Sequence, residues 1–135
     1  MPGQTDLRQL LRTLQPALQP GAYVFCTVRR LSGLNPDDIV CLFREQEGLT
    51  VILPQAAADA LGLPYSFVAS WITLTVHSAL EAVGLTAAFA TALTQANISC
   101  NVVAAYYHDH LFVAQTDAER ALGVLRQLSA EAARA

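Results

Sequence analysis

The residues with the clearest potential for chemistry lie in the loop from His77 to Leu85. This loop joins the end of an expected strand to the start of an expected helix, where free backbone N–H groups and the helix dipole favour an anion such as a carboxylate. Gly84 lets the backbone approach a ligand closely, and Leu80 and Val83 can offer apolar contact. The pattern predicts an anion-binding loop. The alternative is that Gly84 serves a tight turn and Glu81 caps the helix.

Three side chains of the same loop, His77, Ser78 and Glu81, combine a base, a nucleophile and an acid. The chain has no G-x-S-x-G elbow, and three such groups adjacent in one loop rarely reach the geometry of a catalytic triad. We therefore predict no catalytic residue. The alternative is a small enzyme with an interface pocket that uses His77 and Glu81 as acid and base.

The triplet His108-Asp109-His110 has the residue types of a metal site. A metal needs three or four ligands, however, and only His77 remains as a further imidazole. A tight turn rich in Asp and His that bonds its own backbone explains the triplet more simply. We predict no metal and no cofactor.

The elements that must position the His77–Leu85 loop follow from periodicity. A period of two from Val68 to Val76 predicts a half-buried strand with Trp71, Thr73 and Thr75 on its second face. After the loop, the pattern predicts a helix ended by Asn97, a strand over residues 98–107, a turn at 108–110, a strand over 111–114, and a helix with Thr116 as N-cap.

The order strand, helix, strand, strand, helix is most of a ferredoxin-like unit. Its residues resemble an ACT domain, and more narrowly a small family of bacterial ACT-like proteins similar to the ACT halves of CASTOR-type amino-acid sensors. The resemblance extends from about Leu7 to Leu128. It is densest in W-I-T-L-T-V-H-S-A-L-E-A-V-G-L-T-A and in N-V-V-A-A-Y-Y-H-D-H-L-F-V.

The resemblance implies a ligand and an approximate place for it. ACT domains carry a D-x-P-G-L motif between strand and helix, which helps to bind an amino acid at an inter-domain interface. Here Glu81 stands for the aspartate and Val83 for the proline, while Gly84 and Leu85 match. The resemblance therefore implies an amino acid or related carboxylate as ligand.

Asn101 and Val102 are the second part of the implied site. In ACT domains the equivalent strand lends backbone and amide groups to the ligand of a neighbouring domain. Asn101 can offer both a donor and an acceptor. The alternative is that Asn101 bonds a turn or an edge strand. The ligand is expected between the His77–Leu85 loop and the Asn101-Val102 segment of another half or subunit.

The first half of the chain repeats this pattern weakly. A short helix carrying Leu7 to Leu14 precedes a strand over residues 23–28, a hairpin over 39–53 and a helix over 55–61. We predict an α+β protein of two ferredoxin-like, ACT-like halves, with antiparallel sheet covered by helices: a degenerate half at 1–65 and a second half at 66–135. The second half lacks a fourth strand, which could come from the N-terminal half or from another subunit.

Composition limits the partners. The chain of 135 residues is 53% hydrophobic and only 14% charged, which favours contact with another chain and a homo-oligomer, by default a dimer. We place that contact on the Trp71-Thr73-Thr75 face. A net charge of -3 argues against nucleic acid. No segment is apolar and long enough for a signal peptide or a membrane span, so we expect a cytoplasmic protein.

The function predicted from these observations is a small-molecule sensor, a regulatory ACT-domain protein that binds an amino acid and acts on a separate partner. Besides the small enzyme named above, a purely structural assembly module remains as an alternative.

Overall fold

The computed structural model describes residues 6–76 and 82–134. The chain divides into two compact units. Unit 1 combines residues 1–19 with residues 70–135, and unit 2 spans residues 20–69. The predicted α+β class is confirmed, whereas the division of the sequence at residues 65 and 66 stays a prediction.

Unit 1 contains the predicted strand, helix, strand, strand, helix order. Its strands lie in the order β1-β5-β7-β6, and α3 connects β5 to β6 while α4 follows β7. The bounds are α1 Leu7–Thr13, β1 Pro16–Leu18, β5 Val68–Leu74, α3 Leu85–Gln95, β6 Asn101–Ala104, β7 Asp109–Ala114, the 3-10 turn η2 Gln115–Asp117 and α4 Ala118–Arg134.

The fourth strand of unit 1 comes from the N-terminal half of the chain. β1 pairs with β5 in antiparallel register, with Ala17 opposite Thr73. Backbone hydrogen bonds of 2.9 Å from Gln19 N to Trp71 O and from Thr75 N to Gln15 O extend this ladder. The strand is absent from the sequence-based prediction because it is short and begins with a proline, which sheets accept at an edge or at a first position.

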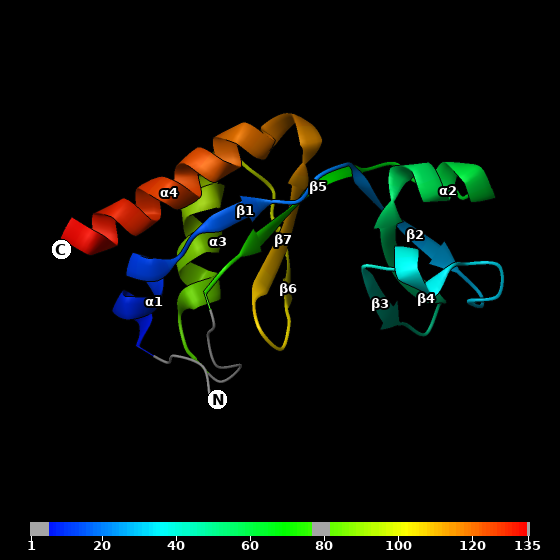
Figure 1. Ribbon diagram of the computed structural model, residues 1–135, viewed down its shortest axis with the longest axis horizontal. Helices are drawn as coiled ribbons and strands as arrows, with labels where there is room; N and C mark the ends of the chain where they lie inside the picture. Colours follow the sequence, from blue (N-terminus) through cyan, green and yellow to red (C-terminus); the bar gives the residue numbers. More distant parts are fainter. Residues whose placement is uncertain (1–5, 77–81, 135) are drawn as a thin grey trace. The chain divides into compact units, whose positions relative to one another are not determined.

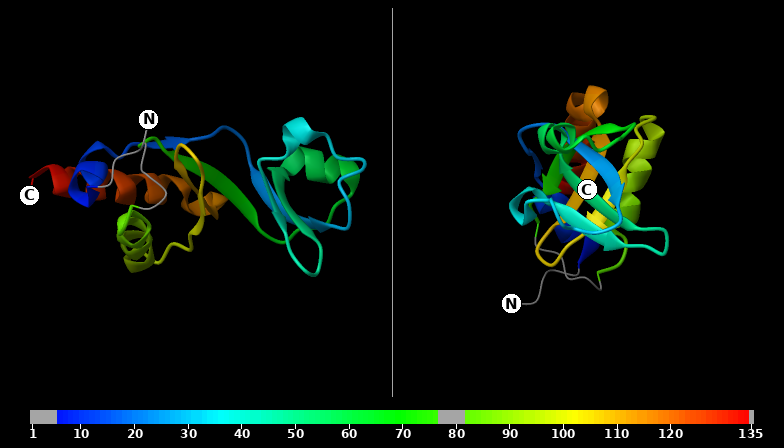
Figure 2. Two further views of the ribbon diagram at one scale, coloured as in Figure 1. Left: turned by 90° about the horizontal axis from the view of Figure 1, so that it is seen from below. Right: turned by 90° about the vertical axis from the view of Figure 1, so that its right-hand side faces the viewer.

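The core of unit 1 lies between its sheet and its helices. Phe89 and Leu93 from α3 and Leu125 from α4 are fully buried against Leu74 and Leu111 of the sheet. Helix α1 adds Leu10 and Leu14 to the same cluster. Figures 1 and 2 show α1 lying beside α4, so that three helices cover this unit.

Unit 2 has the same strand plan with fewer helices. Its strands lie in the order β3-β4-β2-β5, and it contains only the first two residues of β5, which pair with Tyr23 and Val24. The bounds are β2 Tyr23–Val28, the 3-10 turn η1 Pro36–Asp38, β3 Cys41–Arg44, β4 Leu49–Pro54 and α2 Gln55–Leu61. The predicted hairpin is confirmed, and so is the end of α2 at Gly62, whose φ is 68°.

Of three further local predictions, the structure corrects two and confirms one. The predicted turn at 108–110 is wrong: the turn spans Ala105 to His108, closed by a 3.0 Å bond from Ala105 N to His108 O, and Asp109 and His110 begin β7. The last helix begins at Ala118 rather than next to Thr116, because η2 intervenes. Asn97 does adopt the left-handed conformation expected after α3, with φ 60°.

No helix in the described part of the chain combines the length and the apolar character needed to cross a membrane.

Candidate functional site

The first half of the candidate site is the N-terminus of α3. His77, Ser78, Leu80 and Glu81 lie outside the described residues, which resume at Ala82. Gly84 is the N-cap of α3, and among the described residues no side chain caps this end and no acidic residue stands in the first turn. Ala88 N donates to Gly84 O at 2.9 Å, which begins the ladder of intrahelical bonds. Among the described residues, no side chain therefore competes with an anion for the N–H groups before Ala88.

Val83 and Leu85 differ in how much of each side chain a ligand can reach. Val83 is 84% exposed, so it can offer apolar contact to a ligand. The Leu85 side chain is 3% exposed and belongs to the core of unit 1, which leaves only its backbone N–H for a ligand. A ligand could therefore contact the side chain of Val83 but only the backbone of Leu85.

Gly84 is required for a reason that the sequence did not show. Its φ is 101°, a region that side chains disfavour, and a Cβ built on it would lie 3.0 Å from Cδ2 of Leu7. Helix α1 therefore packs against the turn that opens α3. A substitution at Gly84 changes this packing as well as any ligand contact.

Asn101 and Val102 lie on β6, the edge strand of unit 1. Asn101 is exposed, and its amide Nδ2 donates to the backbone oxygen of Phe112, its cross-strand neighbour, at 3.4 Å. This bond goes to β7, an inner strand of the sheet, and not to the turn or edge strand of the alternative interpretation. It leaves the side-chain oxygen as an acceptor. Val102 is half-buried, and its side chain packs against the core of unit 1.

A second polar cluster, formed by residues of β5 and β7 and by Gln19 just after β1, was not anticipated. The indole N–H of Trp71 donates to Nδ1 of His110 at 3.0 Å, and the Thr73 hydroxyl lies 3.0 Å from the same nitrogen. Gln19 donates to that hydroxyl at 3.0 Å. Trp71 also stacks on Phe112, with ring centroids 6.1 Å apart. Trp71 and Thr73 are therefore bound within their own sheet, so their presence on this face does not require a partner chain.

The hydrogen bonds of this cluster determine which ring nitrogen of neutral His110 carries the proton. An indole N–H can only donate, so Nδ1 of His110 accepts and the neutral ring carries its proton on Nε2. Burial, and then the positive charge of His108, lower the pKa of His110. The sequence signal was available: Trp71 and Thr73 share one face of their strand, and His110 and Phe112 share one face of theirs.

Two further ionisable residues, His108 and Asp109, lie next to His110. The ring centroids of His108 and His110 are 6.5 Å apart. Asp109 is 6% exposed, and burial raises its pKa while His108 lowers it. In residues 6–76 and 82–134 no three His, Cys, Asp or Glu side chains are grouped so as to hold a metal ion. That no metal binds this triplet stays a prediction.

Comparisons with known proteins identify the type of domain. The ACT-domain family matches residues 2–70 and again residues 66–127. The five residues common to both matches contain the start of β5, which unit 1 uses as its first strand and unit 2 as its fourth. The resemblance to ACT domains seen in the sequence is thereby confirmed.

Three solved structures place the fold among known ones. A Vibrio cholerae protein of unknown function, described as a possible transport protein, is 48% identical, with 91% of this chain and 95% of that chain covered and a TM-score of 0.81. The ligand-free regulatory subunit of aspartate kinase from Thermus thermophilus is 8% identical, covering 86% of this chain and 98% of that one, with a TM-score of 0.57.

The third structure is aspartokinase III from E. coli in complex with aspartate and ADP. It is 14% identical, with 84% of this chain and 32% of that chain covered and a TM-score of 0.57. At such identities the two kinases show likeness of fold only. Among curated proteins, none matches the chain.

Proposed function

The chain belongs to the ACT-domain family, and on that premise we propose that it is a regulatory protein that binds an amino acid or related carboxylate and acts on a separate partner. Family membership supports a regulatory, small-molecule-binding role rather than a catalytic one. The fold shared with an aspartate-kinase regulatory subunit agrees with this role.

The observation that carries the proposal is the N-terminus of α3. It has no acidic residue in its first turn and no side-chain cap among the described residues. A ligand carboxylate would accept from these N–H groups and meet the positive end of the helix dipole. Val83, almost fully exposed beside them, would contact the apolar part of the ligand.

The ligand class rests on two further considerations. The E. coli aspartokinase of similar fold was solved with aspartate, and an amino acid presents the carboxylate that a helix N-terminus favours. We place its amino group near the Asn101-Val102 segment of another copy of the chain. A cytoplasmic location and a homo-oligomeric assembly belong to the same proposal.

The test begins with thermal unfolding of the wild-type protein in the presence of each of the twenty amino acids. A ligand at about a hundred times its dissociation constant stabilises the folded state by about 2.7 kcal/mol, which a shift in Tm reveals. Calorimetry then gives the affinity of any amino acid that raises Tm. If neither an amino acid nor a related carboxylate does so, the proposed function fails.

Thr86→Glu separates binding from stability. Thr86 is exposed in the first turn of α3, so a glutamate there should stabilise the helix by about 0.3–1 kcal/mol. The same charge competes with a ligand carboxylate and should weaken binding roughly two- to fivefold.

Thr86→Gln is the matched control for Thr86→Glu, because it has the same size without the charge and should bind nearly as the wild type does. Equal affinity of the two variants would place the ligand away from α3. Gly84→Val is not a clean test, since the contact with Leu7 makes it a change of stability.

A further inference from the structure

A groove of about 510 Å³ lies between α3 and α4 of unit 1. Ala92 of α3 and Val124 and Leu128 of α4 give it an apolar lining. Gly123 leaves it open, because a Cβ added there would meet no atom within 4 Å. Gly123 has no unusual backbone conformation that would explain a glycine inside a helix, where it costs about 1 kcal/mol relative to alanine.

The helix on one side of the groove carries no charge. The sequence of α3, LTAAFATALTQ, contains no ionisable side chain, although Thr86, Ala87, Thr91, Thr94 and Gln95 are all exposed. A helix that faces water normally bears charged residues on its outer side. An uncharged outer side next to an apolar groove is typical of a surface that contacts another protein.

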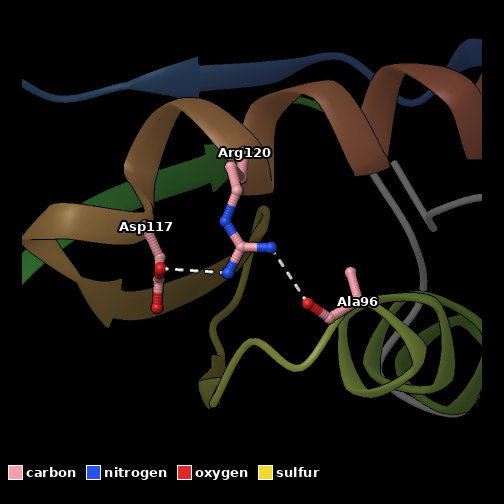
Figure 3. Close-up of polar contacts among 3 residues, drawn as sticks. All are labelled: Ala96, Asp117 and Arg120. Carbon is pink, nitrogen blue, oxygen red and sulfur yellow. Dashed lines mark hydrogen bonds and ion pairs between the residues drawn. The ribbon is translucent and has the colours of Figure 1, made fainter.

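Charged groups mark the two ends of the groove. At one end Arg120 donates from Nη1 to the Ala96 backbone oxygen at 3.0 Å and from Nη2 to Asp117 at 3.1 Å (Figure 3). At the other end Glu131 accepts from Gln127 Nε2 at 3.0 Å. Both charges are thus held in place. Arg120, whose guanidinium has five N–H donors, keeps others for a partner.

The residues of α4 along this groove are self-complementary when two helices run in opposite directions. Arg120 and Glu131 lie at equal distances from the midpoint between Leu125 and Arg126, and so do Gly123 and Leu128. An antiparallel copy centred there would set Arg120 level with Glu131 of that copy, at both ends of a contact about 16 Å long. It would also set each Leu128 opposite the open space at Gly123.

We propose that the α3–α4 groove is the surface on which two copies of this chain associate, with their α4 helices antiparallel about a two-fold axis. Such a pairing is closed, since each copy presents the same surface to the other. Leu128 of each copy fills the space above Gly123 of the other, and two Arg120–Glu131 ion pairs close the ends. We assign a second copy of the chain to this groove because Arg120 at one end and Glu131 at the other are complementary to the same two residues of an antiparallel copy.

This inference deepens the homo-oligomeric part of the proposed function and does not depend on a ligand. It places the contact on the helices rather than on the Trp71-Thr73-Thr75 face. Failure of amino-acid binding by a dimeric protein would leave it intact, whereas a monomeric protein would overturn it and would also remove the second copy on which the proposed site places Asn101 and Val102.

Charge reversal tests the ion pairs. By light scattering at micromolar concentration, the wild type should have the mass of a dimer. Arg120→Glu alone and Glu131→Arg alone each place like charges opposite one another at both ends, and should weaken the dimer at least about tenfold. Mixing the two single variants restores opposite charges at both ends, so a heterodimer should form. The Arg120→Glu, Glu131→Arg double variant should form a homodimer.

Gly123→Gln tests the apolar contact without touching the charges. In the monomer it should stabilise α4, because glutamine is a better helix former than glycine. In the dimer it occupies the space meant for Leu128, so the dimer should weaken. Ala133→Gln, on an exposed position of α4 outside the groove, is the matched control and should leave the mass unchanged.

The outcomes are decisive in either direction. A monomeric wild type overturns the proposal, and so do single charge variants that dimerise as the wild type does. Arg120→Glu also removes the contacts with Ala96 and Asp117, so circular dichroism must first show that the variant is folded. Should it not fold, Gly123→Gln and Glu131→Arg decide: two dimers of wild-type affinity would overturn the proposal.

Discussion

Unit 1 and unit 2 have the same order of strands and differ in the element that comes after the first strand. In unit 1 the first strand, β5, leads to α3, a helix of 11 residues. In unit 2 the first strand, β2, leads to η1, a 3-10 turn of three residues whose N-terminus is capped by Asn35. Within the described residues, unit 1 therefore has a helix N-terminus open to an anion at this position and unit 2 does not.

The two units share the four-stranded sheet and differ in the helix that follows the first strand. Both units keep four hydrogen-bonded strands, because a sheet that loses a strand exposes unpaired backbone groups. Each takes its fourth strand from outside its own βαββα or βββα segment: β1 for unit 1, and the start of β5 for unit 2. The helix after the first strand can be absent without breaking that ladder, and unit 2 then lacks the helix N-terminus on which the proposed ligand site of unit 1 depends.

The largest difference between the units should be in core stability. Phe89 of α3 is fully buried in the core cluster of unit 1, to which three helices contribute side chains. Leu53 is 1% exposed and lies in the smaller core cluster of unit 2, which includes Ala58 of α2. Phe89→Ala should cost about 3–5 kcal/mol, and Leu53→Ala should fall near the lower end of about 2–5 kcal/mol.

Urea unfolding followed by far-UV circular dichroism gives both costs. Fluorescence of Trp71, the only tryptophan, reports on unit 1 alone. A larger loss for Leu53→Ala than for Phe89→Ala would show that unit 2, despite its smaller core cluster, carries the stability of the chain.

The second prediction compares two glycines with positive φ. Gly62, which ends α2 in unit 2, has open space where an added Cβ would lie, so Gly62→Ala should cost only the strain of the left-handed backbone, about 1–2 kcal/mol. Gly84→Ala in unit 1 should cost more, because its Cβ would also press on Leu7 at 3.0 Å.

Adding Leu7→Ala should recover part of the Gly84→Ala loss and none of the Gly62→Ala loss. Thermal unfolding of the single and double variants measures this coupling. Equal costs at the two glycines, with no rescue, would mean that α1 yields freely and does not constrain the turn before α3.

Much of this fold follows from local pattern. The period-two strand β5, the hairpin of β3 and β4 and the left-handed residue Asn97 after α3 depend on neighbours in sequence, and each was predicted correctly. The strand predicted over 98–107 is shorter in the structure, where β6 spans Asn101–Ala104. β1 was missed because its three residues carry too little pattern, and pairing with β5 alone makes it a strand.

In the candidate site, too, features set by local sequence were predicted, and contacts between residues far apart in sequence were not. The α3 N-terminus was predicted from the strand–glycine–helix order, and Gly84 is its N-cap. The contact between Gly84 and Leu7 joins residues far apart in sequence, so no local pattern could show it. The Trp71–His110 bond was missed for a more specific reason: the His108-Asp109-His110 triplet was assigned to a turn, whereas β7 turns His110 towards Trp71.

The third prediction is that sensitivity to mild acid belongs to unit 1. All three histidines of the sequence lie outside residues 20–69. The pKa of His110 is lowered from 6.5, so the unfolded chain takes up a proton while the folded ring stays neutral, and stability is lost as pH falls below about 6.5. The ionisable groups beside His110 are His108 and Asp109. The pKa of Asp109 is raised from 3.8, so its effect has the opposite sign: its contribution to stability is lost as the pH rises above 3.8.

Fluorescence of Trp71 should therefore change with a midpoint below pH 6.5, because protonation of Nδ1 breaks its bond to the indole. His110→Asn keeps an oxygen acceptor for Trp71 but cannot titrate there, so both the fluorescence change and the loss of Tm on acidification should shrink. An unchanged titration in this variant would assign the acid response to His77 or His108.

The smallest effect concerns the thiols, and here unit 2 should be the more reactive. Burial raises the pKa of Cys100 in unit 1 to about 11 and raises that of Cys26 in unit 2. The thiolate is the reacting form, so at pH 8 only about one Cys100 in a thousand is reactive. Cys41 lies half-buried on the edge strand β3. Iodoacetamide on the native protein should therefore label Cys41 first, and Cys26 and Cys100 at comparable rates only in urea. Peptide mass spectrometry over time measures the order, and rapid labelling of Cys100 would mean that β6 opens locally from β7.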